Sequence, residues 1–117
     1  MFPSAPPASS IVGKTLTSTG TLATVPAGHW FTGTVMLSAS VAVAGASSPK
    51  ITINGGDAHP PGGSVVAQIN LAGLALTTIA DSCSMEIVAY ADTADITIDF
   101  TAGANGVSSG SISGYYF

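Results

Sequence analysis

Charge is what this chain has least of. Its 117 residues include two lysines, no arginine and six acids, so 7% of them are charged, whereas soluble domains are about a quarter charged. Disorder is not expected, because 46% of the residues are hydrophobic and disordered chains combine low hydrophobicity with high net charge. The composition predicts one domain that covers part of its surface by packing against neighbours.

The shortage of cations also limits the partners. Lys14 and Lys50 are the only basic residues beside two histidines, and the net charge is −4. Two separated lysines cannot form the basic patch that binds nucleic-acid phosphates or an anionic membrane surface. We therefore expect neither nucleic acid nor membrane as a partner.

Cysteine is almost absent as well. Cys83 is the single cysteine, which excludes an internal disulfide. A nucleophilic thiol needs electropositive surroundings, but the local run DSCSME is acidic. Cys83 is therefore predicted to be a small, buried, apolar residue.

Targeting signals are not recognisable in the sequence. The first ten residues, MFPSAPPASS, contain neither a basic stretch nor an apolar one, so they do not resemble a secretory signal. No apolar run approaches the roughly 20 residues of a membrane span. We expect the protein to be made and assembled in the cytoplasm.

Motifs of catalysis are missing too. The sequence contains no G-x-S-x-G elbow, phosphate-binding loop, dinucleotide fingerprint or H-E-x-x-H pair. Catalytic sites draw on His, Arg and Cys, of which this chain has two, none and one. We therefore predict a protein that is not an enzyme and needs no cofactor.

Metal ligands could come from two groups of residues, Asp57 with His59 and the cluster of Asp92, Asp95 and Asp99 near one hairpin. Asp57 and His59 share the loop from Asn54 to Gly63, but two ligands are too few for a structural zinc site. That loop is interpreted as a long, exposed hairpin loop. Asp95 and Asp99 lie on one face of a predicted strand about 13 Å apart by strand rise, too far for a single ion. We interpret them as a solvated strand face.

Short strands with a period of two dominate what is present. The stretches 30–43 and 95–101 alternate apolar residues with Thr, Ser or Asp, the pattern of half-buried strands. Further strands, bounded by Gly, Pro, Asn or Asp, are expected within 15–25, 50–54, 64–71, 74–80, 85–91 and 109–117. About seven to nine such strands predict an all-β fold, a β-sandwich of antiparallel strands, with a jelly-roll-like order favoured over an immunoglobulin-like one.

The amino-terminal stretch is expected to be separate from this domain. Pro3, Pro6 and Pro7 disfavour helix and favour extended, polyproline-like backbone. We predict an arm over residues 1–13 and a single sandwich domain over 14–117. The arm is either a frayed terminus or a docking segment with Phe2 as its anchor.

Apolar residues on both faces of one strand predict an oligomer. In 85–91, one face carries Met85, Ile87 and Ala89, and the other carries Val88 and Tyr90 beside Glu86. Two-sided apolarity requires a cover on both faces, and the carboxy-terminal SISGYYF is also too apolar to be left exposed. We predict a homotrimer of wedge-shaped sandwiches whose subunit contacts are Val88, Tyr90, Tyr115, Tyr116 and Phe117. An alternative use of the aromatics is a sugar-stacking platform formed by Trp30, Phe31, Tyr90, Tyr115, Tyr116 and Phe117.

Two runs resemble a known group of proteins. The run TLATVPAGHWFTGTVMLSASVAV at 21–43 and the ending GVSSGSISGYYF at 106–117 resemble small all-β virion structural proteins of tailed bacteriophages. The resemblance implies a non-enzymatic, often trimeric jelly-roll-like or tumour-necrosis-factor-like unit that decorates or cements a capsid. No catalytic residue is carried over by it.

The expected function is therefore that of a capsid decoration or cement protein. It would stabilise the phage head by contacts with the major capsid protein, through Phe2, Pro3, Pro6 and Pro7 of the arm, and with its own copies. Its expected location is the virion, assembled in the host cytoplasm. The alternatives are a tail-fibre module that binds a host surface carbohydrate, and a bacterial surface-array or spore-coat subunit.

Overall fold

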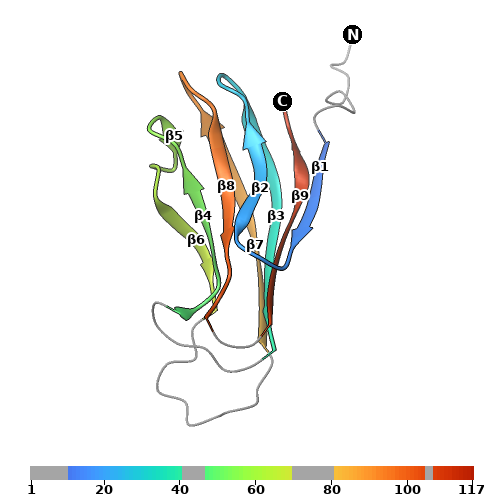
Figure 1. The fold of residues 1–117 in the computed structure, drawn as a ribbon. Helices are drawn as coiled ribbons and strands as arrows, with labels where there is room; N and C mark the ends of the chain where they lie inside the picture. Colours follow the sequence, from blue (N-terminus) through green and yellow to red (C-terminus); the bar gives the residue numbers. More distant parts are fainter. Residues whose placement is uncertain (1–10, 41–46, 70–80, 105–106) are drawn as a thin grey trace.

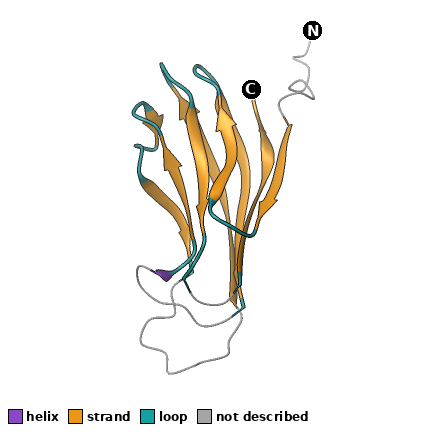
Figure 2. Ribbon diagram, in the orientation of Figure 1, coloured by secondary structure: helices purple, strands orange, loops and turns teal. Residues whose placement is uncertain are grey.

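A computed structural model describes residues 11–40, 47–69, 81–104 and 107–117. Its nine described strands pack as two sheets face to face (Figure 1), and strands make up most of the described chain (Figure 2). The prediction of an all-β sandwich of antiparallel strands is confirmed. The strands are β1 (Ile11–Leu16), β2 (Gly20–Val25), β3 (Trp30–Ala39), β4 (Lys50–Asn54), β5 (Ala58–His59), β6 (Ser64–Gln68), β7 (Asp81–Ala91), β8 (Ile96–Thr101) and β9 (Ser108–Tyr116).

The strand pairing is strongly non-local. The five-stranded sheet has the order β1-β9-β3-β7-β5, and the four-stranded sheet has the order β2-β8-β4-β6. With the short β5 set aside, the first strand pairs with the last, the second with the next to last, and so on to β4 with β6. Every pairing is antiparallel, so segments far apart in the sequence become neighbours on one surface.

The core lies between the sheets and follows the alternation of the sequence. In β8, Ile96, Ile98 and Phe100 are buried while the residues between them are partly exposed. In β3, Phe31 and Leu37 are fully buried, whereas Trp30 and Met36 are exposed. Because alternate side chains of a strand point to opposite faces, each of these strands contributes one face to the core and one to the surface.

Two glycines let β3 and β9 approach each other around a core ring. Gly33 lies directly opposite Gly114 in the β3·β9 pair, and a Cβ on Gly33 would come within 2.8 Å of Phe31 Cζ. The ring of Phe31 therefore fills the space that two side chains would otherwise occupy.

The structure differs from the sequence prediction in two segments, residues 11–13 and 54–63. Residues 11–13, expected in the arm, belong to β1, because the whole of β1 pairs with β9 from Ile11↔Tyr115 to Leu16↔Gly110. The loop 54–63, expected to be free of strands, contains β5, which pairs with β7. The predicted strand at 74–80 lies outside the described residues, as do residues 41–43 and 70–71 of two other predicted strands.

Within the described ranges, no helix is long and apolar enough to cross a membrane.

Candidate interaction site on the five-stranded sheet

A row of rings crosses one end of the outer face of the five-stranded sheet. Phe117 and Trp30 exchange backbone hydrogen bonds, Trp30 lies opposite Tyr90 in the β3·β7 pair, and Tyr90 lies opposite His59 in the β5·β7 pair. The ring centroids of Trp30 and Tyr90 are 4.8 Å apart, and the His59 ring stacks on Tyr90 at 6.2 Å. The strands β3, β7 and β5 thus supply a line of three rings, and Phe117, the residue after β9, pairs with Trp30 through the backbone at its end.

A second row lies next to the first. Thr32 of β3 is flanked by Tyr115 on β9 and by Val88 on β7, and the Tyr115 ring lies 5.7 Å from that of Phe117. Six residues in these two rows have bulky side chains, and we call them the aromatic platform: Trp30, His59, Val88, Tyr90, Tyr115 and Phe117.

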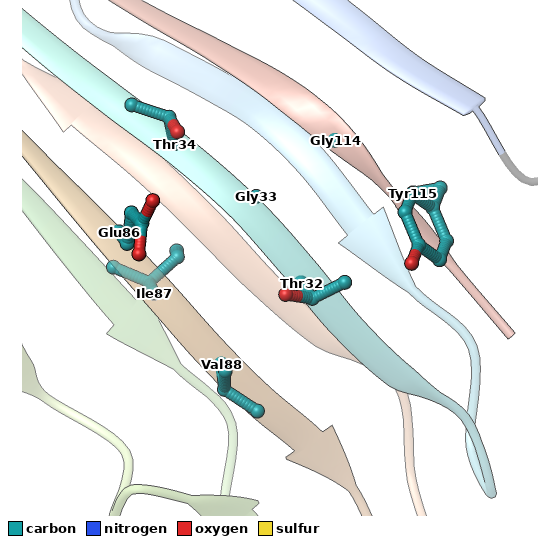
Figure 3. Close-up of a pocket in the computed structure, with 8 residues that line it drawn as sticks. All are labelled: Thr32, Gly33, Thr34, Glu86, Ile87, Val88, Gly114 and Tyr115. Atoms are coloured by element: carbon teal, nitrogen blue, oxygen red, sulfur yellow. The ribbon is translucent and has the colours of Figure 1, made fainter.

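A shallow depression lies beside the aromatic platform. It has a volume of about 480 Å³, and Thr32 and Thr34 lie between Tyr115 on one side and Glu86 and Val88 on the other (Figure 3). The depression exists because the short side chains of Thr32 and Thr34 lie between bulkier neighbours. It can hold an extended segment or a small group, but it is too open to enclose a substrate.

The aromatic platform is exposed, and few charged side chains lie near it. The exposed fractions are 45% for Trp30, 58% for Val88 and 52% for Phe117. Among the outward positions of β3, β7 and β9, the single charged side chain is Glu86. Exposed aromatics with few charges are typical of the centre of a protein–protein interface.

Four of the five predicted subunit-contact residues are brought together here. Val88, Tyr90, Tyr115 and Phe117 all belong to the aromatic platform, but Tyr116 points to the opposite face. It packs against the core and edge-on to His29, with ring centroids 5.7 Å apart. The alternation of β9 is the reason, since neighbouring residues of a strand cannot share a face.

Five further predicted contact residues are not found on this surface. Of the sugar-stacking candidates, Phe31 is fully buried in the core and is not on the surface. The arm residues Phe2, Pro3, Pro6 and Pro7 lie outside the described residues.

His59 is the member of the aromatic platform that the sequence did not indicate. Its Nε2 lies 4.0 Å from Asp92 Oδ2, and the neighbouring Asp57 carboxylate accepts a hydrogen bond from Thr93 Oγ1. The two-residue strand β5 gives too short a pattern to be recognised from sequence. Among the described residues, no group of three or more His, Cys, Asp or Glu side chains is arranged to hold a metal ion.

Cys83 lies on β7 opposite Leu37 and is partly exposed, rather than fully buried as expected. Its inward-facing side chain packs against the margin of the core, at a part of β7 that β5 does not reach. Burial, and then the charge of Asp81, raise the pKa of the Cys83 thiol above its ordinary value. The thiol is therefore protonated at neutral pH and is a poor nucleophile.

The outer face of the four-stranded sheet is polar instead. The Asp99 carboxylate accepts hydrogen bonds from Thr21 Oγ1 at 2.7 Å, Asn54 Nδ2 at 2.6 Å and Thr97 Oγ1 at 3.0 Å. Asp95, which we grouped with Asp99 on a solvated strand face, lies just before β8 and accepts a separate bond from the Ala27 backbone N–H. Asp99 thus ties together β2, β4 and β8.

Replacing Asp99 with alanine is expected to lower the free energy of unfolding by about 1–3 kcal/mol, because three hydrogen bonds to a half-buried charge are lost. Asp92→Ala is the matched control, since Asp92 is largely exposed and has its histidine neighbour at 4.0 Å. Its effect is expected to stay within about 0.5 kcal/mol. Urea unfolding of both variants makes the comparison, and equal losses would contradict a structural role for Asp99.

Comparisons with protein-family models, with curated proteins and with solved structures find no match to this chain. The chemistry of its surface therefore carries the functional assignment.

Proposed function

We propose that this protein is a non-enzymatic structural subunit of a virion, of the capsid decoration or cement type. It binds other copies of itself through the aromatic platform and the major capsid protein through the arm. The observation that carries the proposal is the aromatic platform itself, an exposed set of rings with two carboxylates, those of Glu86 and Asp92, beside it. Such a face favours a large dry contact over the binding of an ionic substrate.

The strand order supports the jelly-roll part of this proposal. A jelly roll is an eight-stranded double sheet wound from two Greek keys. Pairing of the first strand with the last, and of each following strand with its counterpart from the other end, is the arrangement of a folded two-stranded ribbon wrapped into two sheets. The resemblance of the sequence to small virion proteins implies a jelly-roll-like unit as well.

The Glu86 carboxylate on the face favours a cyclic trimer over a face-to-face dimer. In a two-fold contact, the same patch meets itself, so two aromatic platforms would bring two Glu86 carboxylates toward one interface, and β3, β7 and β9 carry no lysine to pair with them. Like charges across an interface cost several kcal/mol. In a three-fold ring the contacts are heterologous, so the aromatic platform meets a different surface of its neighbour and Glu86 is not opposed by its copy.

Binding to shells tests this proposal. The purified full chain is mixed with emptied shells of the major capsid protein from the same genome, and bound protein is measured by co-sedimentation and by copy number per particle. We expect saturable binding at a fixed number of copies, and a trimer by analytical ultracentrifugation. A protein that is monomeric at micromolar concentration and does not bind the shells would overturn the proposal.

Binding of a carbohydrate, as part of a tail fibre, is the second candidate. It is favoured by the exposed row of Trp30, Tyr90 and His59 with the Asp92 carboxylate beside it. Ring faces stack on sugars, and carboxylates accept hydrogen bonds from sugar hydroxyls. Glycan binding that is lost in Trp30→Ala, in a protein that does not bind shells, would select this function instead.

A further inference from the structure

We infer that Lys14 keeps β1, one edge of the five-stranded sheet, from pairing with β1 of a second copy of this chain. The block is a property of the folded subunit. Only its consequence, that copies meet through the aromatic platform and not through strand edges, rests on the function proposed above.

β1 presents an open strand edge at the margin of the five-stranded sheet (Figure 1). It pairs with β9 over its whole length, and none of the described strands lies on its other side. In an antiparallel pair the ladder hydrogen bonds come at alternate residues, so the remaining N–H and C=O groups of β1 point away from β9. Such an edge is a template for a strand of another chain.

Apart from Lys14, β1 has the composition of a strand that pairs readily. Its sequence is IVGKTL, with three β-branched residues and neither proline nor an acidic residue. Long, uncharged edges of this kind are where sheet proteins associate and aggregate. In a chain with 7% charged residues, a single charge on this edge is therefore informative.

Lys14 points to the core side of β1. It lies opposite Ile112, which is buried in the core, and directly opposite residues share a face. Val12 and Leu16 lie on the same side of β1 and pack against the core. Lys14 between them is exposed, and no ion pair joins it to another described residue. An inward-pointing charge is one of the devices by which natural sheets avoid edge pairing.

The register of a β1·β1 pair shows how the charge acts. For two copies to keep their cores on the same side of one continuous sheet, core-side residues must lie opposite core-side residues. The register that sets Val12 opposite Leu16 of the second copy also sets the two Lys14 side chains directly opposite each other, where like charges are destabilising. A shift by two residues, the smallest that keeps the faces, places each ammonium opposite an apolar residue, Val12 or Leu16.

The strand that follows β1 in the chain is an edge as well, and it is interrupted in a different way. β2 ends the four-stranded sheet, and its register against β8 shifts between Thr21 and Ala23, so Leu22 is an extra residue. Such bulges also turn strand edges away from pairing. Both edge strands thus carry a feature that opposes the addition of another strand.

Neutral substitutions of Lys14 test this inference in the full-length Val88→Glu chain, in which we expect association through the aromatic platform to be weakened already. We expect Lys14→Thr and Lys14→Gln to dimerise with a dissociation constant at least about tenfold lower than that of the Val88→Glu parent, because a like-charge contact and its desolvation are removed. Sedimentation velocity over a range of concentrations measures it. Amide hydrogen exchange is expected to slow at β1 in the dimer, and circular dichroism checks that strand content is retained.

Lys50→Thr in the same parent is the matched control. It changes the net charge equally, but on β4, whose two edges are paired with β6 and β8, so it is expected to sediment like the parent. Lys14→Glu is expected to do the same, because two carboxylates oppose each other as two ammonium groups do.

The inference is overturned if Lys14→Thr and Lys14→Gln associate no more than Lys50→Thr does, or if Lys14→Glu dimerises as they do. Dimers of the neutral variants without slower exchange at β1 would overturn it too. None of these comparisons uses shells or requires the aromatic platform to bind, so failure of the proposed function and failure of this inference are separately visible.

Discussion

Gly33→Ala is expected to lower the free energy of unfolding by about 3 kcal/mol, at the upper end of the range for overpacked cores. The new Cβ would lie 2.8 Å from Gly114 Cα, 2.8 Å from Phe31 Cζ and closer still to the Ser113 carbonyl oxygen. Two of these atoms are backbone, and the third belongs to a fully buried ring. None can withdraw cheaply, so either the β3·β9 ladder opens or Phe31 leaves its place in the core.

Gly13→Ala provides a control of identical chemistry. Gly13 lies in β1 of the same sheet, and a Cβ there would meet nothing within 4 Å. Both substitutions reduce the conformational freedom of the unfolded chain equally, so the difference between them isolates the close approach. Urea unfolding followed by circular dichroism measures it. Similar midpoints for the two variants would show that β3 and β9 are not packed as described.

Val88→Glu is expected to weaken association between copies by about 2 kcal/mol or more, roughly thirtyfold. Val88 is 58% exposed, so the substitution leaves the core untouched. It adds a second carboxylate to the face that carries Glu86, two residues away on the same strand. Burying both in a contact without a cation would be costly.

Val65→Glu is the matched control for that experiment. Val65 is exposed to a similar extent, 49%, on β6 of the other sheet, where we propose no subunit contact. Sedimentation velocity over a range of protein concentrations and binding to shells are the two measurements. If Val65→Glu weakens association as much as Val88→Glu does, the contact is not on the aromatic platform.

Most individual strands were predictable because their signal is local. The alternation in 96–101 and in 30–39 marks the buried face residue by residue, and β4 has the bounds predicted for it, 50–54. The turn residues that bound these stretches are equally local. The strand β5 was missed because two residues cannot show a period of two, and its existence depends on pairing with β7.

The candidate site was predictable only in part. The sequence marked Val88, Tyr90, Tyr115 and Phe117 as apolar residues in need of a cover, and these do share a surface. It also grouped Tyr116 with them, although the backbone of β9 turns that ring toward His29 and the core. His59 was assigned to a loop, and its place beside Tyr90 follows from β5 alone.

The all-β class, the scarcity of charge and the buried face of each strand follow from composition and from the two-residue period of a strand, so they could be predicted from the amino-acid sequence. Tertiary structure decided which strands are neighbours. Phe117, Trp30, Tyr90 and His59 are far apart in the chain and form one row because β9, β3, β7 and β5 lie side by side. That order is set by the packing of whole sheets around a common core, which no short stretch of sequence encodes.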